Sequence, residues 1–227
     1  MKKLFVLFVM SLFVVSASFA QINKNWDGTK PEVHQGAKGF VFSYTPFQSD
    51  LGGAPAGSFS GYNIATDQIT VTNMAGVGFR YFVTQNISLT GGLNFGSASQ
   101  TGTDTSGFDY SASTFGISVD GDYHFKSLYS VSPYFGVNIN YGMISNKITS
   151  KTAAAVETKV SGGVFGAGLN FGFDWYFTPG IALGGKYTLG FNSISGKETT
   201  TGSTTVTNPK GSFFGTGTGS FQLKVNF

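Results

Sequence analysis

Six charged residues occupy polar positions in segments where bulky and small residues alternate, which makes them the first candidates for chemistry. They are Arg80, Asp120, Asp122, Asp174, Lys186 and Lys224. Three are basic and three are acidic. Counted along the sequence, all six lie at similar distances from the nearest short link between segments or from the chain end, which indicates that their side chains form one layer. In a narrow interior each charge needs a partner, because burying a charge alone is costly. Two hypotheses stay open: a static salt-bridge plug, which we favour, or a gate whose partners exchange and open a small pore.

The chain has no cysteine and two histidines, His34 and His124, which restricts its catalytic and metal chemistry. Without cysteine there is no disulfide, no thiol nucleophile and no cysteine-ligated zinc site. A Ser–His nucleophile pair needs a suitably placed histidine. His34 lies near the N-terminus, and His124 precedes a short predicted link at 126–132, so neither lies near the long polar links of the chain. We therefore expect no enzyme activity, no cofactor and no metal.

Residues 162–168 are rich in glycine, but they do not predict a phosphate-binding loop. Such a loop requires a following helix whose N-terminus binds the anion, and an alternating strand pattern follows here instead. The net charge of +3 is also too small for a nucleic-acid-binding surface. We expect no nucleic-acid partner.

The elements that position these residues are predicted from a period of two, which turns alternate side chains of a strand to opposite faces. One face carries bulky apolar residues, such as Phe165 and Leu169, and the other carries glycine, serine, asparagine and the six charges. Eight such runs lie at 39–46, 76–81, 87–95, 115–125, 134–143, 165–175, 181–191 and 220–227. Long polar links lie near 49–70, 97–112, 145–158 and 192–212, and short links near 83–86, 126–132 and 178–180.

This pattern predicts an all-β fold, an eight-stranded antiparallel transmembrane up-and-down β-barrel with the bulky face outward. The alternative is a soluble barrel or sandwich with the bulky face inside. Those side chains would crowd an eight-stranded interior, which is only just wide enough to be filled. Lipid accepts the bulky face instead, and closure satisfies the backbone of every strand. Aromatic residues near the strand ends fit an interfacial girdle: Tyr81, Phe82, Tyr123, Phe125, Trp175, Phe177 and Phe227.

The first twenty residues predict a secretory signal peptide. Lys2 and Lys3 precede an apolar run, and Ser18 and Ala20 place small residues at the positions that signal peptidase reads. We therefore divide the chain into a signal peptide at 1–20, a periplasmic leader at 21–36 and an outer-membrane barrel at 37–227. Bacterial barrels have short periplasmic turns and longer extracellular loops, so the alternation of links places both termini in the periplasm.

Two segments resemble the small outer-membrane barrels of the OmpA and OmpX type from Gram-negative bacteria. One is the Pro-Tyr-Phe-Gly-Val-Asn sequence at 133–138, which opens the fifth run. The other is the C-terminal run, in which Phe221, Leu223, Val225 and Phe227 look like the signal read by the barrel-assembly machinery. The resemblance covers about 37–227. It implies a monomer in the outer membrane that contacts lipid and lipopolysaccharide, without the peptidoglycan-binding domain of full-length OmpA proteins.

The expected role is structural or interactive: stabilisation of the envelope and display of four polar loops. The alternative role is transport, as a small porin-like channel or as an OmpW-like conduit for small or apolar solutes. The lumen positions of the outer half are small and uncharged, which leaves room for a water-filled vestibule open to the outside. They are Asn94, Gly116, Ser118, Asn138, Asn140, Gly142, Gly166 and Gly168.

Overall fold

The protein is represented by a computed structural model, which describes residues 35–45, 74–102, 107–126, 130–151, 157–200, 210–215 and 219–227. The predicted signal peptide at 1–20, the leader up to residue 34 and the predicted link at 49–70 lie outside the described residues. In the part of the chain that the structure describes, no helix is long and apolar enough to cross a membrane.

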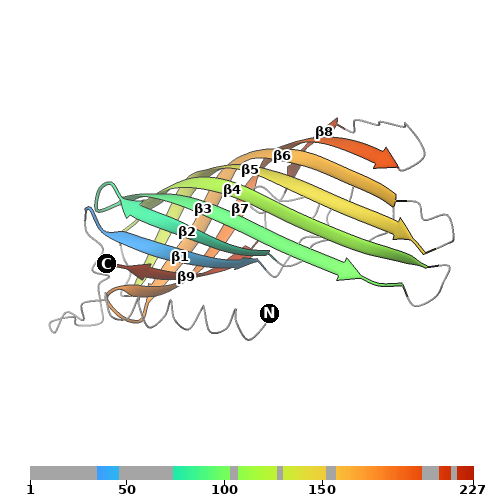
Figure 1. The fold of residues 1–227 in the computed structure, drawn as a ribbon. Coiled ribbons are helices and arrows are strands. Elements are labelled where there is room, and N and C mark those ends of the chain that lie inside the picture. Colours follow the sequence, from blue (N-terminus) through green and yellow to red (C-terminus); the bar gives the residue numbers. More distant parts are fainter. Residues whose placement is uncertain are drawn as a thin grey trace.

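The described residues form one sheet of nine strands (Figure 1). The strands are β1 (Lys38–Thr45), β2 (Met74–Phe82), β3 (Ile87–Gln100), β4 (Phe108–His124), β5 (Val131–Ser150), β6 (Glu157–Tyr176), β7 (Ile181–Thr200), β8 (Lys210–Gly215) and β9 (Gly219–Asn226). Strands β1 to β7 pair in chain order, and β9 pairs with both β7 and β1. The sheet closes because β9 pairs with both of these strands, and all the pairs are antiparallel. The predicted up-and-down barrel is therefore confirmed.

The eighth strand of the barrel consists of two segments, β8 and β9. The first pairs with Gly190–Ser195 of β7, and the second pairs with Ile181–Tyr187 of the same strand. On its other side β9 pairs with β1 between Gly39 and Tyr44, and this short seam closes the barrel. Nine strand segments therefore build an eight-stranded wall.

The two ends of the barrel differ. The start of β1 and the end of β9 lie together at one end, where Lys38 N donates to Phe227 O at 2.9 Å (Figure 1). We call this the short-turn end, because the links β2–β3 and β6–β7 also turn there. At the other end β4 to β7 extend beyond β1 and β2, and we call it the long-link end.

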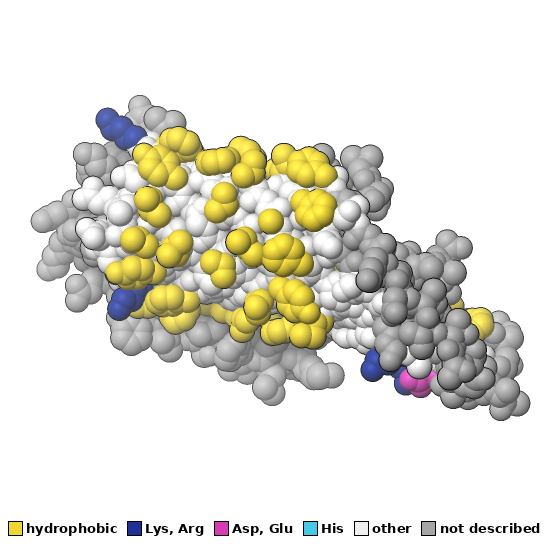
Figure 2. All heavy atoms as spheres, turned by 90° about the horizontal axis from the view of Figure 1, so that it is seen from above, with side chains coloured by type: hydrophobic (Ala, Val, Ile, Leu, Met, Phe, Trp, Pro, Cys, Tyr) yellow, Lys and Arg dark blue, Asp and Glu magenta, His cyan; other side chains and the backbone are white. Residues whose placement is uncertain are grey.

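The outer wall of the barrel is apolar and the interior is polar, as the period of two predicts. Bulky outward side chains are strongly exposed, with Val119 at 60% and Ile139 at 56%, whereas the inward Asn138 and Asn170 are buried. Figure 2 shows hydrophobic side chains spread over the middle of the wall, with lysine and arginine at its margins. A protein whose exposed face is apolar between two polar ends matches the lipid bilayer.

Three of the predicted long links are too long, because the strands run into them. Segments predicted as links at 97–112, 145–158 and 192–212 contain the ends of β3 to β7 and the start of β8. Strands β5, β6 and β7 each have 20 residues, about twice the 9–11 that cross a bilayer. The serine- and threonine-rich sequence resembles a loop, but backbone pairing continues outside the lipid without apolar side chains.

One predicted orientation also needs correction. The sequence predicts Phe82 in the outer aromatic girdle, but its side chain faces the lumen and is buried. It lies two residues beyond Arg80 and therefore on the same face of β2. The other six girdle residues are between 40% and 50% exposed. Val225 has the outward phase of β9, but it is buried between the neighbouring positions Phe40 and Ile181.

Candidate functional site

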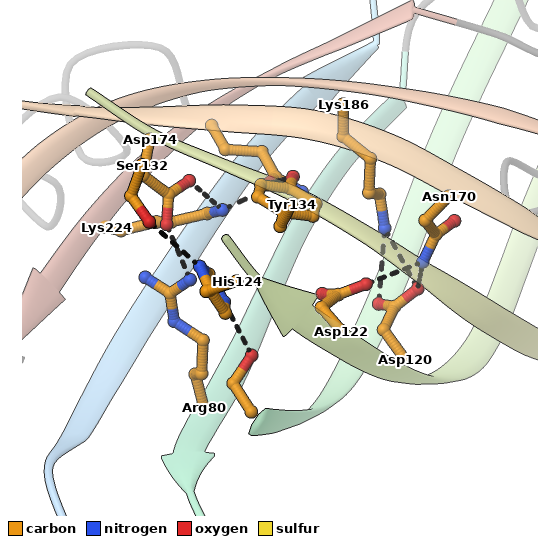
Figure 3. Close-up of polar contacts among 12 residues, drawn as sticks. Arg80, Asp120, Asp122, His124, Ser132, Tyr134, Asn170, Asp174, Lys186 and Lys224 are labelled. Atoms are coloured by element: carbon orange, nitrogen blue, oxygen red, sulfur yellow. Dashed lines mark hydrogen bonds and ion pairs between the residues drawn. The ribbon is translucent and has the colours of Figure 1, made fainter. Parts of the chain in front are cut away.

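Asp174 of β6 holds two cations in the lumen near the short-turn end (Figure 3). Its Oδ2 accepts a hydrogen bond from Arg80 Nη1 at 2.7 Å, and its Oδ1 accepts one from Lys224 Nζ at 2.5 Å. All three side chains are at most 4% exposed. Around the closed wall β2 and β6 are four strands apart in either direction, so the Arg80–Asp174 pair spans the lumen. We call these three residues the ionic triad.

Small residues on β7 make room for the triad. Gly184 pairs with Asp174 on β6 and with Gln222 on β9, two residues before Lys224. A Cβ atom at Gly184 would lie 3.0 Å from Asp174 Oδ1 and 3.4 Å from Lys224 Cε. Ala182 of β7, which pairs with Lys224 of β9, is completely buried. The short side chains of β7 thus let charged groups from β6 and β9 meet in front of it.

Aromatic rings surround the triad. Arg80 Cζ lies 5.0 Å from the centre of the Phe82 ring, and Lys224 Nζ lies 4.6 Å from that of Tyr134. Both distances suit cation–π attraction, which is strongest where water is excluded. Tyr176 is also buried at this level. These three rings were not predicted as site residues, although each occupies the lumen phase of its strand.

His124 lies between the rings of Phe82 and Tyr134, with centroid distances of 5.1 and 5.2 Å. Its Nε2 is 3.0 Å from Ser88 Oγ, and its Nδ1 is 3.3 Å from Ser132 Oγ. The serine–histidine distance resembles that of a nucleophile and its base, but the third group is a hydroxyl rather than a carboxylate. Ser88 is completely buried, which leaves no approach for a substrate. His124 therefore joins three strands through packing and hydrogen bonds.

The other three predicted charges form a second cluster farther from the short-turn end (Figure 3). Lys186 Nζ lies 3.2 Å from both carboxylate oxygens of Asp120. Asn138 and Asn170 each donate a side-chain hydrogen bond to Asp120 Oδ1 at 2.7 Å. Asp122 accepts one from Asn170 at 3.3 Å, and no described lysine or arginine lies within ion-pairing distance of it.

All six predicted residues therefore face the lumen, but they form two clusters rather than one layer. The triad contains two cations and one anion, and the second cluster contains one cation and two anions. The charges balance only over both clusters together. Among the described residues, no group of three or more histidine, aspartate or glutamate side chains is placed to hold a metal ion.

The lumen beyond the second cluster is narrow. A cavity of about 40 Å³ lies beside Asp120 and Lys186, which is room for about one water molecule. Asn138 and Asn140 of β5, which also face the lumen, are buried. Still closer to the long-link end, four inward side chains pack together, and we call them the apolar collar: Met74, Ala112, Ile144 and Val164. The open vestibule expected from the small residues of the outer half stays a prediction.

A closed barrel with an apolar wall and an ion-paired lumen defines the class of transmembrane β-barrels. Residues 11–221 match the family model described as outer membrane protein beta-barrel domain. The chain belongs to this family, and its location is the outer membrane. The resemblance to small outer-membrane barrels noted in the sequence is confirmed.

Solved structures share this architecture at low sequence identity. A major outer membrane protein from Thermus thermophilus has a TM-score of 0.51 at 14% identity, over 84% of this chain and 99% of that chain. Ail, the attachment invasion locus protein of Yersinia pestis, has a TM-score of 0.40 at 12% identity, over 85% and 99% of the two chains. The N-terminal barrel of Pseudomonas aeruginosa OprF has a TM-score of 0.32 at 15% identity, over 86% and 99%. The first likeness supports the fold. No curated protein sequence matches the chain.

Proposed function

We propose that the protein is a closed structural barrel that stabilises the outer membrane and presents its long links to the exterior. It works as a monomer without a catalytic step. The observation that carries this proposal is the Arg80–Asp174 ion pair, which spans the lumen with both side chains buried.

The energetics favour a plug over a gate. Separating Asp174 from its two cations leaves buried charges without partners, which costs several kcal/mol. Thermal energy is about 0.6 kcal/mol, so such an exchange is rare without an external driving force. The apolar collar on β2, β4, β5 and β6 adds to this barrier, because apolar side chains in a lumen disfavour the passage of water and ions. A solute would have to displace both the collar and the triad.

The same proposal orients the protein with the long-link end outside and both termini in the periplasm, after removal of the signal peptide. The outward side chains of β4 to β7 become polar beyond the apolar band, as expected for loops that emerge from the outer leaflet. At the other end, Phe227 packs on Phe40 with ring centroids 5.8 Å apart. Phe221, Leu223, Val225 and Phe227 would serve as the signal for the barrel-assembly machinery.

Conductance in planar lipid bilayers tests the proposal. The purified, folded protein should show no single-channel steps under conditions in which a porin does. Ile144→Ser, which opens the collar alone, should also stay silent because the triad still closes the lumen. Stable wild-type steps, with an ion selectivity that shifts in Lys186→Gln, would overturn the proposal in favour of a small porin-like channel. Unchanged lipid A after expression would support the absence of a catalytic step.

A further inference from the structure

The outward face of the barrel changes character beyond the apolar band, toward the long-link end. Phe95, Phe115 and Met143 are exposed and occupy one row across β3, β4 and β5. Two residues farther along these strands and β6, the pairing register aligns four outward serines in one row. They are Ser97, Ser113, Ser145 and Ser161. The next outward positions of β5 and β6 are Lys147 and Lys159.

These two lysines lie directly opposite each other across the β5–β6 pair. Like charges at directly opposed positions of an antiparallel pair are destabilising. Lys147 is offset by Glu157, whose Oε2 lies 2.7 Å from its Nζ. Among the described residues, no carboxylate lies within ion-pairing distance of Lys159. The pair therefore carries a surplus of positive charge that an anion would stabilise.

The lysines border a surface hollow of about 470 Å³. Its rim also includes the carboxylate of Glu157, which pairs with Lys147, and five serines. The serines are Ser97, Ser99, Ser111, Ser113 and Ser145. Hydroxyl groups donate and accept hydrogen bonds, so they suit phosphate and sugar oxygens. The hollow thus combines positive charge with hydroxyl groups on a wall that is continuous with the lipid-facing band.

The height of the hollow indicates its occupant. Lys147 lies four residues beyond Met143, which is about 13 Å along the strand and less in height because barrel strands are tilted. A lysine side chain can bend back toward the interface. Acyl chains against Phe115 and Met143 would therefore place their own headgroup beside the lysines. A soluble anion has no acyl chains to contact the apolar band, so nothing would hold it at this height on the wall.

We propose that Lys147 and Lys159, with the flanking serines, bind the phosphorylated headgroup of a lipid in the surrounding leaflet. The proposal rests on the proposed function for one point, that the long-link end faces outward. The outer leaflet then supplies a phosphorylated glycolipid, whose acyl chains cover the apolar band below.

The test measures binding of purified bisphosphorylated lipid A to the full-length folded protein in neutral detergent, by native mass spectrometry and titration. A basic residue near an anionic lipid contributes about 1 kcal/mol, which is about fivefold in affinity. Lys147→Gln and Lys159→Gln should each weaken binding about fivefold, and the double variant about 25-fold. Lipid A without phosphates should bind the wild type and the double variant alike.

Two matched controls change a lysine elsewhere. Lys38→Gln lies on the exposed face at the short-turn end, and Lys151→Gln removes a lysine that pairs with Asp109 at 3.1 Å. Both should bind lipid A as the wild type does. Equal binding by the double variant would overturn the inference, and displacement of the lipid by millimolar inorganic phosphate would reassign the site to a free anion. Binding in detergent does not depend on orientation or conductance, so failure here is distinct from failure of the proposed function.

Discussion

Arg80 Nη1 lies 2.7 Å from Asp174 Oδ2, across the full width of the barrel. The two residues belong to β2 and β6, which stand opposite each other in the closed wall. Wall strands four positions apart share no backbone hydrogen bonds, so this pair joins them through side chains alone. This ion pair links the two strands across the lumen, and Lys224 forms a second ion pair with Asp174.

Asp174→Asn should lower the free energy of unfolding by about 3–5 kcal/mol, because it leaves Arg80 and Lys224 buried without their counter-ion. Urea-induced unfolding in lipid vesicles measures the loss. The matched control is Asp109→Asn, which removes the exposed partner of Lys151 and should cost less than about 1 kcal/mol. Equal losses in the two variants would mean that the lumen is hydrated and the triad is not a plug.

Gly172→Ala should destabilise the barrel by about 1–3 kcal/mol through overpacking. A Cβ atom at Gly172 would collide with Tyr134 Cζ and with the Gly185 carbonyl oxygen. Gly91→Ala is the control, since a Cβ atom there meets nothing within 4 Å. If both alanine variants unfold at the wild-type urea concentration, the Tyr134 ring does not pack against β6 as described.

Leu169→Arg should cost about 2–4 kcal/mol, because it places a charge against the middle of the bilayer. Leu169 is exposed at the centre of β6, between Val137 and Leu189 of the adjacent strands. Ser145→Arg, outward but beyond the apolar band, should be nearly neutral. An unchanged unfolding transition for Leu169→Arg would show that this face does not meet lipid.

The proposed orientation can be tested with single-cysteine variants, because the chain contains no cysteine of its own. A membrane-impermeant maleimide should label Lys151→Cys in intact cells, since this exposed residue lies at the long-link end. Lys126→Cys, exposed at the short-turn end, should react only after the cells are broken. The opposite labelling pattern would invert the barrel in the membrane.

The sequence predicts the direction of side chains better than their partners. Period two places Arg80, Asp120 and Asp174 in the lumen, because alternation depends only on the strand that carries each residue. Which charge meets which depends on the stagger between distant strands, and no single run contains that information. Hence the six residues appear as one layer in the sequence but form two clusters in the structure.

Aromatic residues and strand ends were harder to predict for related reasons. Phe82 has the composition of a girdle residue, and only its phase relative to Arg80 shows that it points inward. Ser97 and Ser113 resemble loop residues, yet they are paired strand positions outside the lipid. Amino-acid composition indicates which environment a side chain prefers. Strand pairing depends on the backbone, so a strand can continue wherever its partner strand continues.

The position of Lys224 links the closure of the barrel to the completion of the ionic triad. Arg80 and Asp174 lie on β2 and β6, so without β9 the Asp174 carboxylate has one cation instead of two. When β9 joins β7 and β1, it covers both open sheet edges and delivers Lys224 to Asp174 in the same step. An unfinished barrel therefore carries both an exposed edge and an electrostatic imbalance, and one strand corrects both.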